Sequence, residues 1–203
     1  MRKIQAVLFD YGGVLADEGF SNVLEALAME QDLAVESMTV EGMQVVYDSG
    51  FVLGKGSESE FWSLLRKRTG LHGDDADFRA RMFEGFVMRP WMLELVDRLR
   101  EQGYITGILS DQVDWLDRLD ARDHFYEHFE HVYNSYYMGK GKRDVSHFID
   151  VAADLGVKPS AILFIDDSER NVATAMEAGM QAIHYVDREA LMQELKDKGI
   201  KFE

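Results

Sequence analysis

The feature that most constrains this chain is a set of short apolar runs that each end in a carboxylate or a hydroxyl. Those ends are Asp10 after residues 4–9, Ser110 after residues 104–109, and Asp166 with Asp167 after residues 161–165. Apolar runs of this length are typical of strands buried in a parallel sheet. Two further strands are expected at residues 131–134 and 181–186.

Helical patterns alternate with these runs from residue 90 onward. Residues 90–102 carry apolar side chains on one helical face, with Pro90 in the first turn and Gly103 just past the end. Further helices are expected at residues 145–155, 169–178 and 188–198. This alternation predicts an α/β fold, with a doubly wound parallel sheet of five strands.

Residues 18–88 interrupt that alternation with a segment that is expected to be all helical. Helices are expected near residues 21–31, 40–49, 58–69 and 76–86. Ser57 and Glu60 form a capping box before the third of these helices, and Gly70 ends it. We therefore expect an α/β core domain from residues 1–17 and 89–203, with residues 18–88 inserted after the first strand as a helical cap.

Composition narrows the classes of function. The chain has 203 residues, no cysteine, and 37 acidic against 22 basic side chains, which gives a net charge of −15. The absence of cysteine excludes disulfides, thiolate metal sites and cysteine nucleophiles. The acidity argues against nucleic acid and anionic membranes as partners. No targeting segment or apolar run of about 18 residues is visible, so a cytoplasmic protein is expected.

The polar strand ends are the candidate site. In open α/β sheets ligands bind at the carboxyl ends of the strands, so Asp10, Ser110, Asp166 and Asp167 are expected to converge there. An Asp after a strand is often only a turn or helix-capping residue, and for Asp10 taken alone this interpretation has the same weight as a functional one. Two adjacent carboxylates are harder to explain in that way, because they repel unless a cation holds them. Asp10 with Asp167, and with Asp166 as a further ligand, fits an oxygen-only Mg²⁺ site.

Four segments resemble, in order, the motifs of the haloacid dehalogenase-like (HAD) hydrolase superfamily. They are VLFDYGGVL at 7–15, ILSD at 108–111, a stretch from Ser135 through GKGKRD at 139–144 to Phe148, and FIDDSERNV at 164–172. The helical insert after the first motif resembles the subgroup with a small C1 cap. Arg89-Pro90 and the spacings in the last two motifs look most similar to the bacterial α-D-glucose-1-phosphate phosphatase branch.

The resemblance implies a Mg²⁺-dependent phosphatase that acts on a small phosphorylated metabolite, such as a sugar phosphate. The oligomeric state, monomer or homodimer, stays open on the sequence. It implies a nucleophilic carboxylate that forms an aspartyl-phosphate, a metal held by carboxylates and one carbonyl, and groups that bind the phosphoryl oxygens. Asp10 is the implied nucleophile. The implied metal ligands are Asp10, the Gly12 carbonyl, Asp167 and Asp166, and Asn171 would orient them. The implied substrate-binding residues are Ser110, Asp111 and Lys142.

Three positions depart from the family pattern. Gly12 stands where most of the phosphatases carry a second Asp as general acid, a group worth about 10²–10⁴-fold in rate. Asp111 stands where Asn is common, and we expect it to cap a helix and point away. Arg143 replaces a usual Pro and is expected to be an exposed side chain near a helix start. That replacement leaves Lys140 as an alternative to Lys142.

Other functions stay open on this sequence. A metal-independent haloacid dehalogenase would use Asp10 against carbon and tolerate Gly12, but it gives no role to Asp166 and Asp167. A catalytically weak phosphate-binding or regulatory protein would explain Gly12 and Asp111. His124 and His128 have a helical metal spacing, although their aromatic neighbours favour an amphipathic surface helix.

Overall fold

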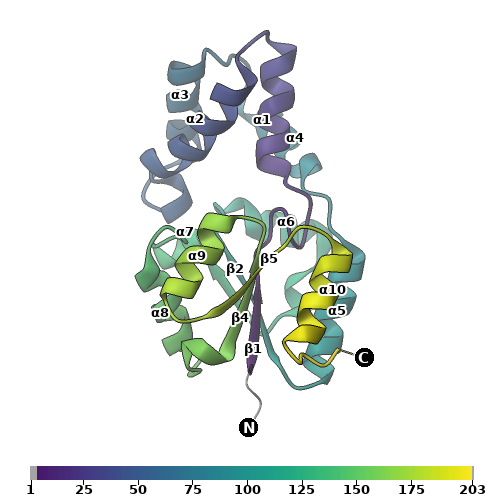
Figure 1. Ribbon diagram of the computed structural model, residues 1–203. Helices are drawn as coiled ribbons and strands as arrows, with labels where there is room; N and C mark the ends of the chain where they lie inside the picture. The colour runs from purple at the N-terminus through teal and green to yellow at the C-terminus, as the bar shows by residue number, and fades with distance from the viewer. Residues whose placement is uncertain (1–3, 203) are drawn as a thin grey trace.

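A five-stranded, all-parallel sheet forms the centre of the protein, as the sequence predicts. The computed structural model describes residues 4–202, so residues 1–3 and 203 of the expected core lie outside it. The strands follow the order β3-β2-β1-β4-β5 (Figure 1). Their bounds are β1 (Ala6–Phe9), β2 (Ile105–Ser110), β3 (His131–Asn134), β4 (Ile162–Asp166) and β5 (Gln181–His184).

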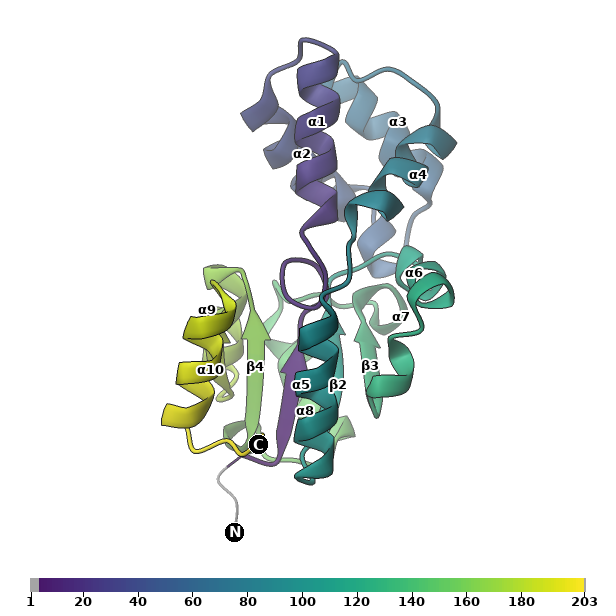
Figure 2. The ribbon, with the colours of Figure 1, turned by 90° about the vertical axis from the view of Figure 1, so that its right-hand side faces the viewer.

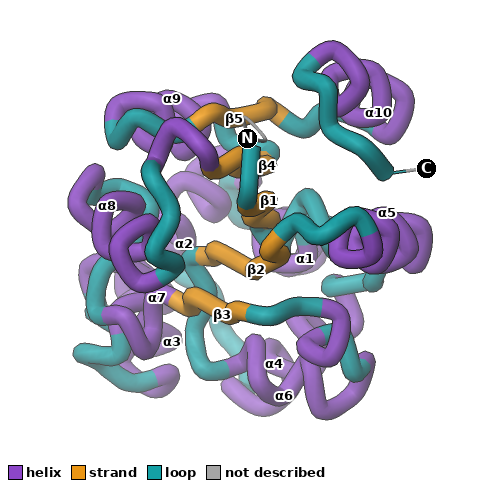
Figure 3. The backbone as a smooth tube through the Cα atoms, turned by 90° about the horizontal axis from the view of Figure 1, so that it is seen from below, coloured by secondary structure: helices purple, strands orange, loops and turns teal. Residues whose placement is uncertain are grey.

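Helices cover both faces of this sheet, because its strands are apolar on both sides (Figure 3). On one face lie α5 (Pro90–Glu101), α6 (Trp115–Asp123) and α10 (Arg188–Asp197). On the other lie α7 (Ser135–Met138), α8 (Val145–Asp154) and α9 (Glu169–Glu177). In α5 the buried side chains recur at helical spacing, at Met92, Leu95, Val96 and Leu99.

The segment between β1 and α5 contains helices only and lies beyond the carboxyl ends of the strands (Figures 1 and 2). We call residues 18–88 the helical cap. Its elements are α1 (Gly19–Glu30), α2 (Val35–Asp48), η1 (Phe51–Leu53), α3 (Glu58–Thr69) and α4 (Asp75–Gly85). An apolar cluster around Phe61, Trp62 and Leu65 fills it and extends to Val113 and Trp115 outside the cap. The assignment of this segment as a separate domain stays a prediction.

Two chain crossings join the helical cap to the sheet. They run side by side, since Ala16 and Met88 form an antiparallel bridge and the Arg89 N–H donates to the Leu15 carbonyl over 2.9 Å. Arg89 also donates to the carbonyl of Val14, at 2.9 Å, and forms an ion pair with Asp17. The pairing holds the cap against the sheet edge at a defined position.

The observed elements differ from the predicted ones in three places. Helix α2 begins at Val35, five residues earlier than predicted, because its first turns bury Met38 in the apolar cluster of the cap. Helix α6, the short α7 and the 3₁₀ turns were not predicted. The expected surface helix through His124 and His128 is wrong, because His124 ends α6 in a left-handed conformation with φ 55°. None of the helices within residues 4–202 has the length and apolar character needed to span a membrane.

Candidate active site

The predicted strand-end residues meet at one point of the sheet. Asp10 follows β1, and its neighbours in the sheet, β2 and β4, end at Ser110 and Asp166. The Ser110 hydroxyl donates a 2.6 Å hydrogen bond to Asp10 Oδ1, and both side chains are buried. The site therefore lies where strand order reverses around β1, which is the place an open α/β sheet offers to a ligand.

Lys142 lies between two of these carboxylates. Its Nζ is 2.6 Å from Asp10 Oδ2 and 2.7 Å from Asp166 Oδ2, and only 1% of the residue is exposed. Burial alone would lower the pKa of Lys142, but the charges of Asp10, Asp166 and Asp111 outweigh it and raise that pKa. Lys140, the alternative, pairs instead with Asp150 on the surface.

Asp166 and Asp167 have different surroundings although they are adjacent. Asp166 is fully buried, and it accepts hydrogen bonds from Asn171 Nδ2 at 3.2 Å and from the Ser168 N–H at 2.8 Å. Asp167 has fewer partners, and burial together with the charge of Asp166 raises its pKa. Asn171 thus fixes the orientation of Asp166, while Asp167 stays available to a ligand.

The carboxylates of Asp10, Asp166 and Asp167 fit a hard divalent cation. One oxygen of each lies within 4.8 Å of the others, and within residues 4–202 this is the one such group of three acidic or histidine side chains. Burial raises the pKa of Asp10 well above its ordinary value, with Lys142 opposing the rise and Asp166 adding to it. An all-oxygen donor set that carries unbalanced negative charge is what Mg²⁺ prefers.

Gly13 is required where it stands. Its backbone has φ +75°, and a Cβ there would lie 2.0 Å from Asp167 Oδ2. Any side chain would therefore both strain the turn after β1 and displace a carboxylate of the site. The second glycine of the Gly-Gly pair is therefore needed for two reasons: the left-handed backbone of the turn and the close approach of the Asp167 carboxylate.

Glu18 is a site residue that the sequence reasoning missed. A Cβ placed on Gly12 would lie 2.7 Å from Glu18 Oε2, so this carboxylate occupies the space of a side chain at position 12. Its other oxygen accepts a 3.0 Å hydrogen bond from the Ser21 N–H at the start of α1. Burial raises the pKa of Glu18. The only signal in the sequence was an acidic residue just after the first crossing into the cap.

Asp111 does not cap a helix, which corrects the prediction that it points away. Helix α6 begins four residues later, and Asp111 lines the cavity instead. Its Oδ1 accepts a 2.8 Å hydrogen bond from the Lys142 N–H, and its Oδ2 accepts one from the Tyr47 hydroxyl. Asp111 therefore links the lysine loop of the core to α2 of the helical cap.

Arg143 also reaches the helical cap, so the prediction of a merely exposed side chain is wrong. Its guanidinium lies 3.6 Å from the centre of the Tyr47 ring and donates to the Met43 carbonyl at 3.0 Å. Below it, the Ser135 hydroxyl donates to the Val52 carbonyl of η1 at 2.8 Å. These contacts hold the helical cap down over the strand ends.

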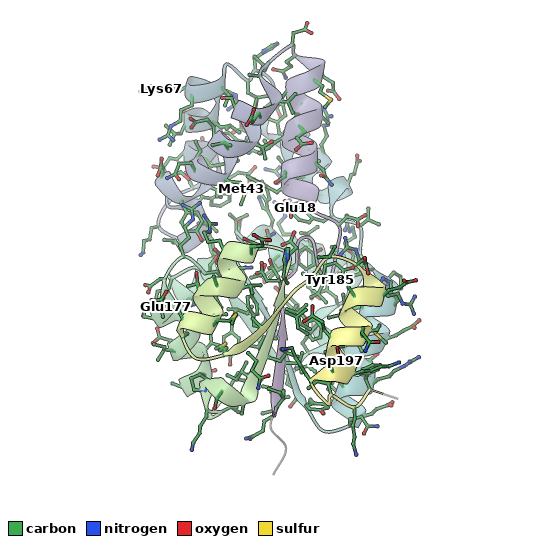
Figure 4. The ribbon with its side chains drawn as sticks, in the orientation of Figure 1. Glu18, Met43, Lys67, Glu177, Tyr185 and Asp197 are labelled. Carbon is green, nitrogen blue, oxygen red and sulfur yellow. The ribbon has the colours of Figure 1, made fainter. Side chains whose placement is uncertain are left out.

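Between the two parts lies a cavity of about 220 Å³. Its floor contains Asp10, Ser110, Lys142, Asp167 and Asn171, together with Gly12 and Asp111. Of the predicted site residues, Asp166 does not line the cavity, because it is fully buried behind Lys142 and Asn171. Its other side is formed by the helical cap, and Figure 4 shows Glu18 and Met43 at this junction. A small molecule held here would have a reactive group against Asp10 and the rest of its body against the cap.

A buried aspartate at the central strand end, paired with a lysine and covered by helices, indicates the class of α/β hydrolases whose site lies at the carboxyl ends of the strands. The comparisons with known proteins agree. The sequence model of the haloacid dehalogenase-like hydrolases matches residues 4–179, and the chain belongs to this family.

Similar proteins include both curated relatives and solved structures. The chain is 24% identical to flavin mononucleotide hydrolase 1 of Arabidopsis thaliana, over 98% of this chain and 79% of the relative. It is 27% identical to glyceraldehyde 3-phosphate phosphatase of Methanopyrus kandleri, over 89% and 83%. A HAD family enzyme from Bacteroides thetaiotaomicron, solved with magnesium and inorganic phosphate, superposes with a TM-score of 0.69 at 25% identity, over 93% of this chain and 98% of that one.

Proposed function

We propose that this hydrolase is a Mg²⁺-dependent phosphatase of a small phosphorylated metabolite, with Asp10 as the nucleophile. The observation that carries the proposal is the position of Asp10, which is buried between Ser110 and Lys142 and opens onto the cavity. A buried carboxylate at this position can act as the nucleophile toward a phosphoryl group. The neighbouring hydroxyl and ammonium groups can bind the phosphoryl oxygens.

Asp10, Asp167 and the Gly12 carbonyl would hold the Mg²⁺, with Asp166 and Asn171 behind them. When bound, the ion would offset the repulsion between a carboxylate and a phosphate dianion. The three clustered carboxylates and the raised pKa of Asp167 support this assignment, because they describe a site with unbalanced negative charge.

The residues of the chain divide the reaction into two displacements. An oxygen of Asp10 forms a bond to phosphorus while the ester P–O bond breaks, and the leaving alkoxide takes the proton of the Glu18 carboxyl. Water then attacks the aspartyl-phosphate and gives a proton to the Glu18 carboxylate, which releases phosphate and restores Asp10 and Glu18. Ser110 and Lys142 bind phosphoryl oxygens in both steps, and Glu18 lies where the leaving oxygen would find a proton donor.

Similar proteins support a phosphate ester as the substrate. One relative is named a glyceraldehyde 3-phosphate phosphatase, and a structural neighbour holds magnesium with inorganic phosphate. A haloacid dehalogenase is the alternative. It would leave the Asp166 and Asp167 pair without a purpose, because displacement at carbon needs no cation.

The test is phosphate release from a panel of phosphorylated metabolites with Mg²⁺, with wild type beside Asp10→Asn. We expect Asp10→Asn to lower kcat by at least about 10³-fold, because the nucleophile is lost. Asp32→Asn is the matched control, since it neutralises an exposed carboxylate of the helical cap and should leave kcat unchanged. Equal activity of Asp10→Asn would remove Asp10 as nucleophile, and halide release from 2-chloropropionate without Mg²⁺ would favour the dehalogenase.

A further inference from the structure

Most of the cap side of the cavity is apolar, and its polar members are Glu18, Ser21 and Tyr47. The floor supplies carboxylates, a lysine and a serine, whereas the cap contributes mainly hydrocarbon and aromatic groups. These are Phe20, Met43, Val46, Phe51, Val52 and Phe61. The phosphoryl group must lie at the floor beside Asp10, so the leaving group of a substrate is the part that meets this surface.

Two of the three polar side chains in the cap lining, Glu18 and Tyr47, already have partners in the protein. The Tyr47 hydroxyl donates to Asp111, and the Trp115 indole N–H donates to Glu58 at 3.3 Å. One carboxylate oxygen of Glu18 accepts a hydrogen bond from the Ser21 N–H, and the other lies beside Gly12. Against the cap, the Ser21 hydroxyl remains for a ligand, while Gln112 and Arg170 line the cavity from the core. A leaving group with several hydroxyl groups would therefore bury most of those that face the cap without a hydrogen-bond partner.

The size of the cavity limits the leaving group as well. Its volume is about 220 Å³, and it must also hold the phosphoryl group. An apolar protein cavity of about 150 Å³ accommodates one benzene molecule. With the helical cap closed as observed, the remaining space suits a group the size of a six-membered ring.

We propose that the preferred substrates are phosphate monoesters of small apolar alcohols, whose hydrocarbon part is about the size of one ring. This inference rests on the proposed phosphatase function and departs from the sugar phosphate expected from the sequence. Each methylene group that enters the apolar side should raise kcat/KM about fourfold until the cavity is full. Each hydroxyl buried without a partner should lower it about tenfold.

Matched pairs of esters test the proposal without changing the chemistry of the leaving oxygen very much. Cyclohexylmethyl phosphate is compared with glucose 6-phosphate, since both are ring-bearing primary esters, and ethyl, propyl and butyl phosphate form a second series. We expect kcat/KM to be at least about 100-fold higher for the cyclohexylmethyl ester and to rise from ethyl to butyl. Equal or higher kcat/KM for glucose 6-phosphate would overturn the inference.

A variant of the lining locates the origin of the preference. Met43→Gln keeps the side-chain length at a residue that is 40% exposed, so the fold should tolerate it, and it places an amide at the cavity. We expect it to reduce the ratio of the two kcat/KM values about tenfold. Met29→Gln is the control, because Met29 is 64% exposed on α1 and does not line the cavity.

The outcomes separate this inference from the proposed function. Phosphate release that depends on Asp10 but favours the hydroxylated ester would leave the phosphatase in place and remove the apolar substrate class. An unchanged ratio in Met43→Gln would also count against the cap lining as its source. Release of no phosphate from any ester would remove the phosphatase itself.

Discussion

The sheet edge and the helical cap face each other across one cavity, and the two surfaces differ in polarity. At the sheet edge, charged groups are buried and fixed by one another, as in the contacts of Lys142 with Asp10 and Asp166. In the cap, the lining is mainly apolar, and its polar residues Glu18 and Tyr47 are hydrogen-bonded within the protein. The first surface suits one kind of chemistry, while the second suits the choice of a leaving group.

The two surfaces also differ in how the chain encodes them. The residues at the sheet edge lie within a few positions of strand ends, so strand geometry alone brings them together. The cap lining comes from α1, α2, η1 and α3, and it depends on how these helices pack. Substitutions at the sheet edge should therefore affect the chemical step for every substrate, whereas substitutions at the cap should change the ranking of substrates.

The largest effect is expected from Lys142→Met. The change leaves the buried carboxylates of Asp10 and Asp166 without their shared cation, which should lower kcat more than about 10³-fold. It should also lower the free energy of unfolding by about 3 kcal/mol, since one partner of a buried ionic cluster is lost. Steady-state kinetics and urea unfolding measure both quantities.

Lys140→Met is the matched control for that variant. Lys140 pairs with Asp150 at the surface, so its loss should change kcat less than about twofold. A kcat for Lys142→Met within tenfold of wild type would show that the buried ammonium does not serve the reaction.

The second prediction separates function from stability at the sheet edge. Burial and the charge of Asp166 raise the pKa of Asp167. A carboxyl with a raised pKa stabilises the fold at low pH, and this contribution is lost as the pH rises through its folded-state pKa. Asp167→Asn should therefore raise the Tm of the cation-free protein by about 2–4 °C at pH 7.5, while lowering kcat at least about 100-fold.

Thermal unfolding with and without Mg²⁺ checks this prediction. The gain in Tm from Asp167→Asn should shrink as the pH falls through the raised pKa of Asp167, because the wild-type carboxyl then becomes protonated. Mg²⁺ should raise the Tm of wild type and of Asp32→Asn but not that of Asp167→Asn. An undiminished response to Mg²⁺ in Asp167→Asn would place the cation elsewhere.

The amino-acid sequence predicts the residues at the sheet edge more completely than those that line the cap. The five strands, their parallel arrangement and the convergence of Asp10, Ser110 and Asp166 follow from local patterns that strand geometry makes meaningful. Spacing favours Lys142 and leaves Lys140 as the alternative, and Lys142 is the lysine that contacts Asp10. Its role in the reaction stays a prediction.

The interactions that cross between the two parts could not be predicted in this way. Asp111 resembled a capping residue because the chain does not reveal that Tyr47 lies above it. Glu18 is separated from Gly12 by only six positions, yet the turn between them decides that its carboxylate fills the space beside the glycine. Such contacts depend on tertiary packing, which no periodicity in the sequence records.

The third prediction concerns Glu18, where the cap supplies a group to the chemistry. Glu18→Gln keeps an oxygen that can accept from the Ser21 N–H but removes the ionisable proton. For alkyl phosphates, whose leaving oxygen is strongly basic, kcat should fall about 10²-fold. For aryl phosphates, which need little protonation, the fall should be less than about threefold.

The pH dependence gives a second measure of the same role. Burial raises the pKa of Glu18, so its protonated form persists to higher pH than that of an ordinary glutamate. The kcat for alkyl phosphates should decline as the pH rises through that pKa, and Glu18→Gln should lack this decline. Glu25→Gln on α1 is the control, and an equal loss on alkyl and aryl esters would assign Glu18 a positioning role only.

The smallest effect is expected where cap and core hold each other in place. Tyr47→Phe removes the hydroxyl that donates to Asp111 but keeps the ring beneath Arg143. The cap should then close less firmly, with kcat/KM about 3–10-fold lower for every ester and the ranking of esters unchanged. Arg143→Lys, which loses the planar stacking on Tyr47, should give a similar result. A changed ranking of esters in either variant would contradict this expectation. It would show that Tyr47 and Arg143 help to select the substrate, in addition to holding the cap against the core.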